Sequence, residues 1–227
     1  FFDLLGMTFL GNWDILQAFS SPIAWTKIFF AAFFPRLYLG EQAEIEYHRI
    51  FPLKKMLTFL AMESAYFHSQ ATLPDTAASA LADSPAGLAA YVLDKWVIAT
   101  NPAYREREDG GYEQNFVLDD LLTNLMLYWT NNVAATLRFY KYNTLDRDKL
   151  RGVLNHKILV PAGTGDPPYE IMHSFRRLVE GNYANLVQYS IYDKGGHFFA
   201  LEHPDIFCAD IRALVVKVLE QQKQLAK

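Results

Sequence analysis

The sequence predicts an α/β protein in which a parallel sheet follows a large helical region. Two observations predict it. Residues 12–150 show apolar residues at helical spacing and few β-branched runs. After Arg151, two short strand-like segments alternate with two helical ones. A strand–helix–strand–helix order is typical of parallel strands joined by crossover helices. Two such strands do not complete a sheet, so we expect further strands from elsewhere in the protein.

Prolines and an Asn pair divide the helical region. We expect short helices between Pro22, Pro35, Pro52, Pro74, Pro85 and Pro102. A clear helix starts at Asp119-Asp120, where early carboxylates suit the positive end of the helix. It carries an apolar stripe of Leu121, Leu122, Leu125, Met126 and Trp129. Asn131-Asn132 interrupts it, and a second helical pattern covers Val133 to Tyr140.

The C-terminal third is predicted element by element. We expect a strand at 157–161, a turn at 163–168, a helix at 171–179 capped by Gly181, a strand at 185–192 and a helix from Pro204. The last helix has an apolar stripe of Phe207, Ile211, Leu214, Val215 and Val218. The single cysteine, Cys208, falls within this helix, and we expect it in the core.

Composition excludes several classes of protein. The 227 residues carry 21 Lys and Arg against 25 Asp and Glu, a net charge of −4 that argues against non-specific nucleic-acid binding. A hydrophobic content of 51% with 15% aromatics excludes a disordered chain. One cysteine excludes an internal disulfide framework. Asp3, Asp14, Lys27 and Arg36 interrupt the apolar N-terminal stretch, so no membrane-spanning helix is expected. The endoplasmic reticulum membrane and the cytoplasm both stay open as locations.

A histidine in a loop is the strongest candidate for chemistry. His197 follows the second predicted strand and a Gly195-Gly196 turn, at the edge where open α/β sheets hold their active sites. Such a histidine could act as a general base or cap the following helix. Asp166 and Glu170 follow the first strand, and either carboxylate could orient His197 or cap a helix. The other histidines form no credible zinc set, so we expect no metal and no cofactor.

Several motifs in register resemble one family. They are Glu63–Gln70 (ESAYFHSQ), Pro74–Thr76 (PDT), Asp83–Tyr91 (DSPAGLAAY), Asp109–Gly111 (DGG), Leu118–Asn124 (LDDLLTN), Tyr128–Thr130 (YWT), Arg138–Lys141 (RFYK), Val160–Pro161 (VP) and Gly195–Phe198 (GGHF). Together they resemble the microsomal and juvenile-hormone epoxide hydrolase family, which has the α/β-hydrolase fold. The resemblance runs from about Glu63 to the C-terminus and is loose before residue 60.

The resemblance implies a reaction and roles for four residues. In this family an aspartate attacks an epoxide carbon to form an ester, and no cofactor is needed. Two tyrosines of a helical lid, matching Tyr66 and Tyr140 here, hydrogen-bond the oxirane oxygen. A histidine–acid pair then activates the water that hydrolyses the ester. The motif places the histidine at His197 and the acid at Glu170 rather than Asp166. An apolar aryl or terpenoid epoxide is the implied substrate.

The sequence departs from the family at the nucleophile. The elbow G-x-nucleophile-x-G that would carry the attacking aspartate is not found in the sequence. We therefore expect three parts: residues 1–11 as a core strand after the elbow, 12–150 as the lid, and 151–227 as the C-terminal part of the core. The N-terminal part of the same enzyme would supply the aspartate. The 227 residues alone should then not complete turnover.

Two other classes remain at this point. A different α/β-hydrolase, such as an esterase or a haloalkane hydrolase, would use the histidine–acid pair without the two phenols. A non-catalytic homologue would bind an apolar ligand with the aromatic lid. The oligomeric state is also undecided, with a dimer compatible with the sequence.

Overall fold

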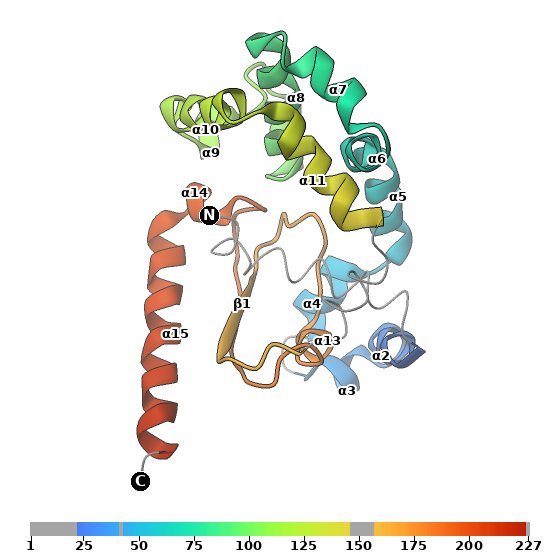
Figure 1. The fold of residues 1–227 in the computed structure, drawn as a ribbon. Coiled ribbons are helices and arrows are strands. Elements are labelled where there is room, and N and C mark those ends of the chain that lie inside the picture. The colour runs from blue at the N-terminus through green and yellow to red at the C-terminus, as the bar shows by residue number, and fades with distance from the viewer. Residues whose placement is uncertain (1–21, 41–42, 146–156, 226–227) are drawn as a thin grey trace. The chain divides into compact units, whose positions relative to one another are not determined.

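The computed structural model describes residues 22–40, 43–145 and 157–225 (Figure 1). These residues form two compact units. The first draws on Phe1–Leu57 and Leu154–Lys227, and the second on Thr58–Val153. Each unit is described by itself. The strand expected at residues 1–11 lies outside the described residues.

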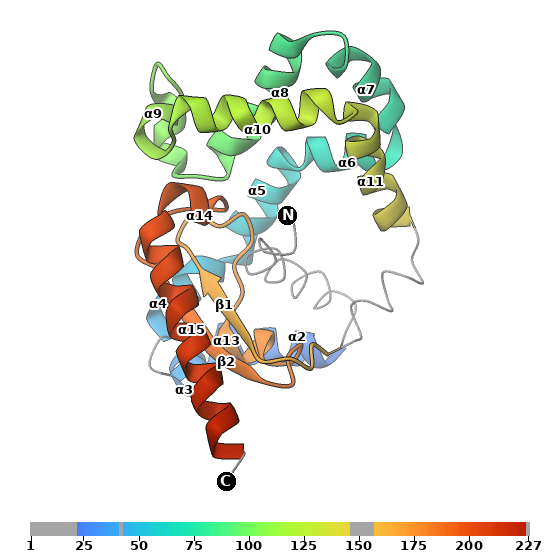
Figure 2. The same cartoon turned by 60° about the vertical axis from the view of Figure 1, so that its left-hand side comes forward.

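A short parallel sheet organises the first unit. β1 (Ala162–Asp166) pairs with β2 (Leu186–Ile191), from Ala162 opposite Leu186 to Asp166 opposite Ile191. Within the described residues the sheet has these two strands. Its helices include α13 (Arg176–Val179) in the β1–β2 crossover, α14 (Phe199–Glu202) and α15 (Pro204–Leu225). The predicted parallel order is confirmed, and Figure 2 shows α15 lying along the strands.

The first strand was predicted five residues too early. Residues 157–161 contribute a single isolated bridge, between Ile158 and Tyr183, and the predicted turn contains the strand itself. The glycines that suggested a turn instead allow close packing. A Cβ atom on Gly163 would lie 2.8 Å from Leu214 of α15, and one on Gly165 would lie 2.7 Å from the Tyr192 hydroxyl.

The crossover helix is shorter than predicted. It starts at Arg176 rather than Ile171, because the Arg176 N–H donates to the Glu46 carboxylate (2.8 Å), which comes from a helix distant in sequence. Gly181 is not a left-handed cap, since it has no positive φ; the helix ends at Val179, and Glu180 is its C-cap. The second strand and the C-terminal helix are confirmed.

Cys208 is exposed, so the prediction that it lies in the core is wrong. The side of α15 that faces the sheet carries Asp210, Leu214, Lys217 and Gln221, a spacing of one helix face. Cys208 precedes Asp210 by two residues, which turns it about 200° away from that face. The predicted stripe also included Val215, which is half exposed.

The described residues of the first unit contain three further helices. They are α2 (Pro22–Phe33), α3 (Pro35–Leu39) and α4 (Ala43–Ile50), and α5 (Leu53–Glu63) follows them across the boundary. Ala24 and Ala31 of α2 share a buried cluster with Phe175 and Leu178 beside α13. Helix α2 therefore packs against the crossover helix α13. The expected domain boundaries at residues 11 and 150 lie outside the described residues and stay predictions.

Within its described residues, the regular structure of the second unit is helical. It contains α6 (Ala65–Thr72), α7 (Pro74–Leu81), α8 (Pro85–Ile98), the 3₁₀ helix η2 (Pro102–Glu106), α9 (Tyr112–Asn115), α10 (Leu118–Thr130) and α11 (Val133–Leu145). The predicted role of the prolines is confirmed, because five of the six are the first residue of a helix and Pro52 directly precedes α5. Asn132, with φ of 71°, separates α10 from α11.

Side-chain capping and packing hold the second unit. Ser84 caps α8 by accepting the Gly87 N–H (3.0 Å). The core cluster consists of Ala78, Leu81, Leu88, Val133 and Leu137.

None of the helices in the described part of the chain is long and apolar enough to cross a membrane.

Candidate active site

Two loops at the carboxyl edge of the sheet carry the candidate site. Glu170 lies in the loop after β1, and His197 lies in the loop after β2. A parallel bridge between Tyr169 and Gly196 joins the loops, with the Tyr169 N–H donating to the Gly195 carbonyl (3.1 Å). Because the strands are parallel, both loops leave the same edge of the sheet, as the sequence predicted.

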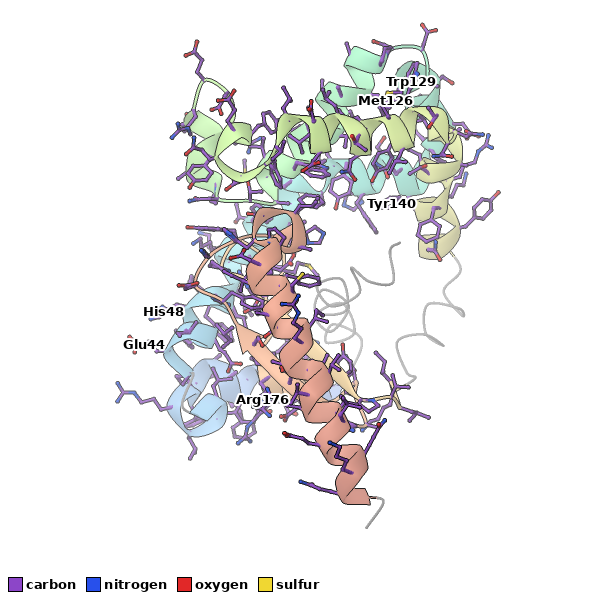
Figure 3. The ribbon with its side chains drawn as sticks, turned by 90° about the vertical axis from the view of Figure 1, so that its left-hand side faces the viewer. Glu44, His48, Met126, Trp129, Tyr140 and Arg176 are labelled. Atoms are coloured by element: carbon purple, nitrogen blue, oxygen red, sulfur yellow. The ribbon has the colours of Figure 1, made fainter. Side chains whose placement is uncertain are left out.

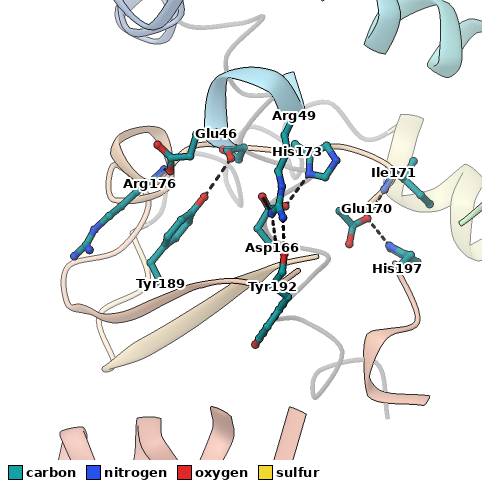
Figure 4. Close-up of polar contacts among 11 residues, drawn as sticks. Glu46, Arg49, Asp166, Glu170, Ile171, His173, Arg176, Tyr189, Tyr192 and His197 are labelled. Atoms are coloured by element: carbon teal, nitrogen blue, oxygen red, sulfur yellow. Dashed lines mark hydrogen bonds and ion pairs between the residues drawn. The ribbon is translucent and has the colours of Figure 1, made fainter. Parts of the chain in front are cut away.

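Glu170 and His197 are in direct contact (Figure 4). Glu170 Oε1 lies 2.7 Å from His197 Nδ1, and the same oxygen accepts the Ile171 N–H at 2.7 Å. The two side chains are 4% and 17% exposed, respectively. An ionised carboxylate only accepts hydrogen bonds, so Nδ1 carries the proton and Nε2 is the basic nitrogen. This is the geometry of a histidine base held by an acid.

The surroundings of His197 raise its pKa. Burial lowers this pKa, but the charge and hydrogen bond of Glu170, together with the charge of Glu202, outweigh burial. Glu202 was not singled out from the sequence. Burial raises the pKa of its own carboxyl to about 7, although Oε1 accepts the Gly196 N–H at 2.9 Å. Glu202 ends the short helix that follows His197, five residues after it in the sequence. This position is the sequence feature that could have indicated a role for Glu202.

Asp166, the alternative acid, has other partners. Its Oδ2 forms an ion pair with Arg49 of α4 (2.7 Å), and its Oδ1 lies 2.8 Å from His173 Nδ1 (Figure 4). The structure therefore brings Glu170, and not Asp166, against His197. Sequence spacing alone had left the two carboxylates equivalent.

The two candidate tyrosines meet in the second unit. Tyr66 of α6 and Tyr140 of α11 have ring centroids 6.2 Å apart at an interplanar angle of 84°. Phe67 packs edge-to-face on Tyr140, and the Lys95 ammonium lies 5.7 Å from the Tyr66 ring centroid. Figure 3 shows Tyr140 on α11. Burial, and then the neighbouring phenols, raise the pKa of Tyr140, so this phenol stays protonated near neutral pH.

The described residues offer no metal site, since no three His, Cys, Asp or Glu side chains among them are grouped to hold an ion. The available chemistry is that of a partly buried histidine and a buried carboxylate at the carboxyl edge of a parallel sheet. A histidine–carboxylate pair in this position of a parallel sheet is typical of the α/β-hydrolases.

Comparison with known proteins shows which enzymes the chain is similar to. Epoxide hydrolase 1 of Sus scrofa is 43% identical over 179 residues, which are 76% of this chain and 38% of that protein. Juvenile hormone epoxide hydrolase 2 of Ctenocephalides felis is 36% identical over 220 residues, 94% of this chain and 45% of that protein. No family model matches the chain.

Solved structures agree with these relatives. The juvenile hormone epoxide hydrolase of the silkworm Bombyx mori superposes with a TM-score of 0.81 at 34% identity, over 89% of this chain and 47% of that one. The Aspergillus niger epoxide hydrolase gives 0.58 at 26% identity, over 76% and 40%. The chain is a homologue of these epoxide hydrolases, and it spans less than half the length of the relatives that it matches.

Proposed function

We propose that the protein containing this chain hydrolyses apolar epoxides to vicinal diols through an aspartyl ester. The observation that carries the proposal is the contact of 2.7 Å between Glu170 and His197 at the carboxyl edge of the sheet. The relatives named epoxide hydrolase support it independently, at 33% to 43% identity.

The first step is ring opening. An aspartate carboxylate, which we assign to a part of the enzyme outside these residues, attacks a ring carbon. A C–O bond forms while the C–O bond of the ring breaks, and the ring oxygen gains negative charge. We propose that Tyr66 and Tyr140 donate hydrogen bonds to this oxygen and that a proton from one phenol neutralises it. A phenol suits this task because it is neutral at pH 7 yet a strong donor.

The second step is hydrolysis of the ester. We propose that His197 Nε2 takes a proton from water, whose oxygen attacks the ester carbonyl. Glu170 stabilises the imidazolium that forms and keeps Nδ1 protonated. Collapse of the tetrahedral intermediate releases the diol alkoxide, which takes a proton from His197. The aspartic acid that results loses its proton, and the phenolate left by ring opening regains one, so both residues are regenerated and water is the only reactant consumed besides the epoxide.

An apolar substrate fits the surroundings of the two tyrosines. Phe67, Tyr91, Tyr128 and Trp129 lie in the same helical unit, and Tyr91 and Tyr128 are close enough to Tyr140 to affect its pKa. Aromatic walls exclude water, and this strengthens hydrogen bonds to a developing alkoxide.

The test is a covalent trap in the full-length polypeptide that carries this chain. We expect the wild-type protein to form diol from an apolar epoxide such as styrene oxide. His197→Ala should form the ester and then stall, so intact-protein mass spectrometry should show an adduct of one epoxide mass. Absence of diol from the wild type, or full turnover by His197→Ala, would overturn the proposal.

A further inference from the structure

A network around Arg49 fixes the ends of both strands (Figure 4). Arg49 Nη1 donates to the backbone carbonyl of Asp166 at 2.5 Å and to its carboxylate at 2.7 Å, while Nη2 donates to the Tyr192 carbonyl at 2.5 Å. Asp166 is the last residue of β1, and Tyr192 directly follows β2. One planar guanidinium thus binds both strands where they end.

The same carboxylate closes the loop that carries Glu170. Asp166 Oδ1 lies 2.8 Å from Nδ1 of His173, so the first and last residues of segment 166–173 are joined side chain to side chain. Glu170 lies inside this closed segment. Its neighbour Tyr169 is bonded through the backbone to Gly195, two residues before His197. The loop of the acid is thereby attached to the loop of the histidine.

The network is withdrawn from water. The side chains of Arg49, Asp166 and His173 are 11%, 9% and 12% exposed. Helix α4 adds a second attachment one turn earlier, where buried Glu46 accepts the Arg176 N–H and hydrogen-bonds Tyr189 of β2. Helix α4 therefore binds the sheet and the loop after β1 through two ionisable side chains, Glu46 and Arg49.

We propose that Arg49 and Asp166 are positioning residues for the Glu170–His197 pair. Asp166 is a carboxylate at the sheet edge that does not contact His197, and its bonds to Arg49 and His173 give it a different task. It holds segment 166–173 so that Glu170 meets Nδ1 of His197. This inference rests on the proposed role of His197 in activating water.

The test uses variants that avoid a lone buried charge, because a single deletion would leave the partner uncompensated. Arg49→Met combined with Asp166→Asn removes both charges, and the Asn side chain can still accept from His173. Arg49→Lys keeps the charge but cannot reach both strand ends. Arg176→Gln is the matched control, since Arg176 forms an exposed ion pair with Glu180 in the same unit.

We expect the double variant to stay folded and to lose about tenfold or more in kcat with KM unchanged. A weaker Glu170–His197 bond should also lower the pKa of His197, and this would move the acid limb of the pH–rate profile to lower pH. Arg49→Lys should fall between the double variant and the wild type, and Arg176→Gln should match the wild type.

Histidine titration by NMR in the same full-length variants reads the pKa of His197 without any turnover. If the wild type makes no diol, the proposed function is wrong, but the pKa of His197 can still be compared between the variants. A folded double variant with the wild-type His197 pKa and kcat would overturn the positioning role. A loss of thermal stability alone, with both values unchanged, would likewise overturn it.

Discussion

Glu170 Oε1 lies 2.7 Å from His197 Nδ1 and also accepts the backbone N–H of Ile171, so one carboxylate oxygen fixes both the histidine and the loop. The other oxygen, Oε2, is buried and has no hydrogen-bond partner among the described residues. The negative charge of Glu170 is thus directed at the imidazole, and this charge raises the pKa of His197 against the opposing effect of burial.

We therefore expect Glu170→Gln to lower the pKa of His197 and to slow ester hydrolysis. A base works in its neutral form, so the acid limb of the pH–rate profile should move to lower pH. The plateau should fall by about two orders of magnitude or more, because the imidazolium and its tautomer are no longer stabilised. Single-turnover decay of the ester between pH 5 and 9 measures both effects. An unchanged acid limb would contradict the electrostatic role of Glu170.

Glu202 gives a prediction about stability and pH. Its pKa is raised to about 7 by burial, whereas an ordinary glutamate in the unfolded chain titrates near 4.5. The folded protein therefore binds this proton more tightly, so the stabilisation is complete below pH 4.5 and is lost as pH rises through about 7. Glu202→Gln removes this loss and can still accept the Gly196 N–H.

The expected result is a gap between wild type and Glu202→Gln that opens with pH. The variant should gain stability relative to wild type from pH 5 to pH 8, as followed by urea unfolding at each pH. Glu180→Gln, which changes an exposed glutamate of the same unit, is the control. Parallel stability curves for Glu202→Gln and wild type would show that Glu202 does not titrate as described.

Two glycines with positive φ test the packing of the histidine loop. Gly195 and Gly40 have φ values of +85° and +82°, so alanine is strained at both. A Cβ atom at Gly195 would also lie 2.8 Å from Cε2 of buried Phe199, whereas nothing lies within 4 Å at Gly40. Phe199 stacks on Tyr192 at 4.1 Å and has little room to move.

At Gly40, where φ of 82° and ψ of −141° form a backbone that favours glycine, alanine should cost about 1–3 kcal/mol of unfolding free energy and leave activity unchanged. Gly195→Ala should cost about 1–3 kcal/mol more and should also lower kcat, because the loop that carries His197 must shift. Chemical denaturation and steady-state kinetics check the pair. Equal losses of stability at the two positions would show that the contact with Phe199 is not tight.

Local sequence patterns predicted the elements whose position depends on residues close to them in the sequence. Prolines marked helix starts, and the strand at 186–191 followed from its apolar run. The sequence also placed His197 correctly in the loop after that strand. The first strand was misplaced because Gly163 and Gly165 are typical of turns, and their reason for being glycine lies in the distant residues Leu214 and Tyr192.

Long-range contacts explain what the sequence left undecided at the site. Asp166 and Glu170 are four residues apart, and spacing alone did not distinguish them. Arg49, more than a hundred residues earlier in the chain, binds Asp166 and leaves Glu170 to His197. The capping of α13 by Glu46 likewise depends on a contact across 130 residues. Such contacts have no local signature.

The tyrosine pair separates an epoxide hydrolase from an esterase. Tyr66→Phe and Tyr140→Phe keep the ring contact between the two side chains but remove the proposed donors to the oxirane oxygen. Each change should slow ester formation by about a hundredfold, the usual effect of losing one such donor. Tyr142→Phe, on the exposed side of α11, should have no effect. Rapid-quench measurement of ester formation from styrene oxide reads this step directly. If the double variant forms the ester at the wild-type rate, the phenols do not activate the oxirane and a simpler hydrolase chemistry is favoured.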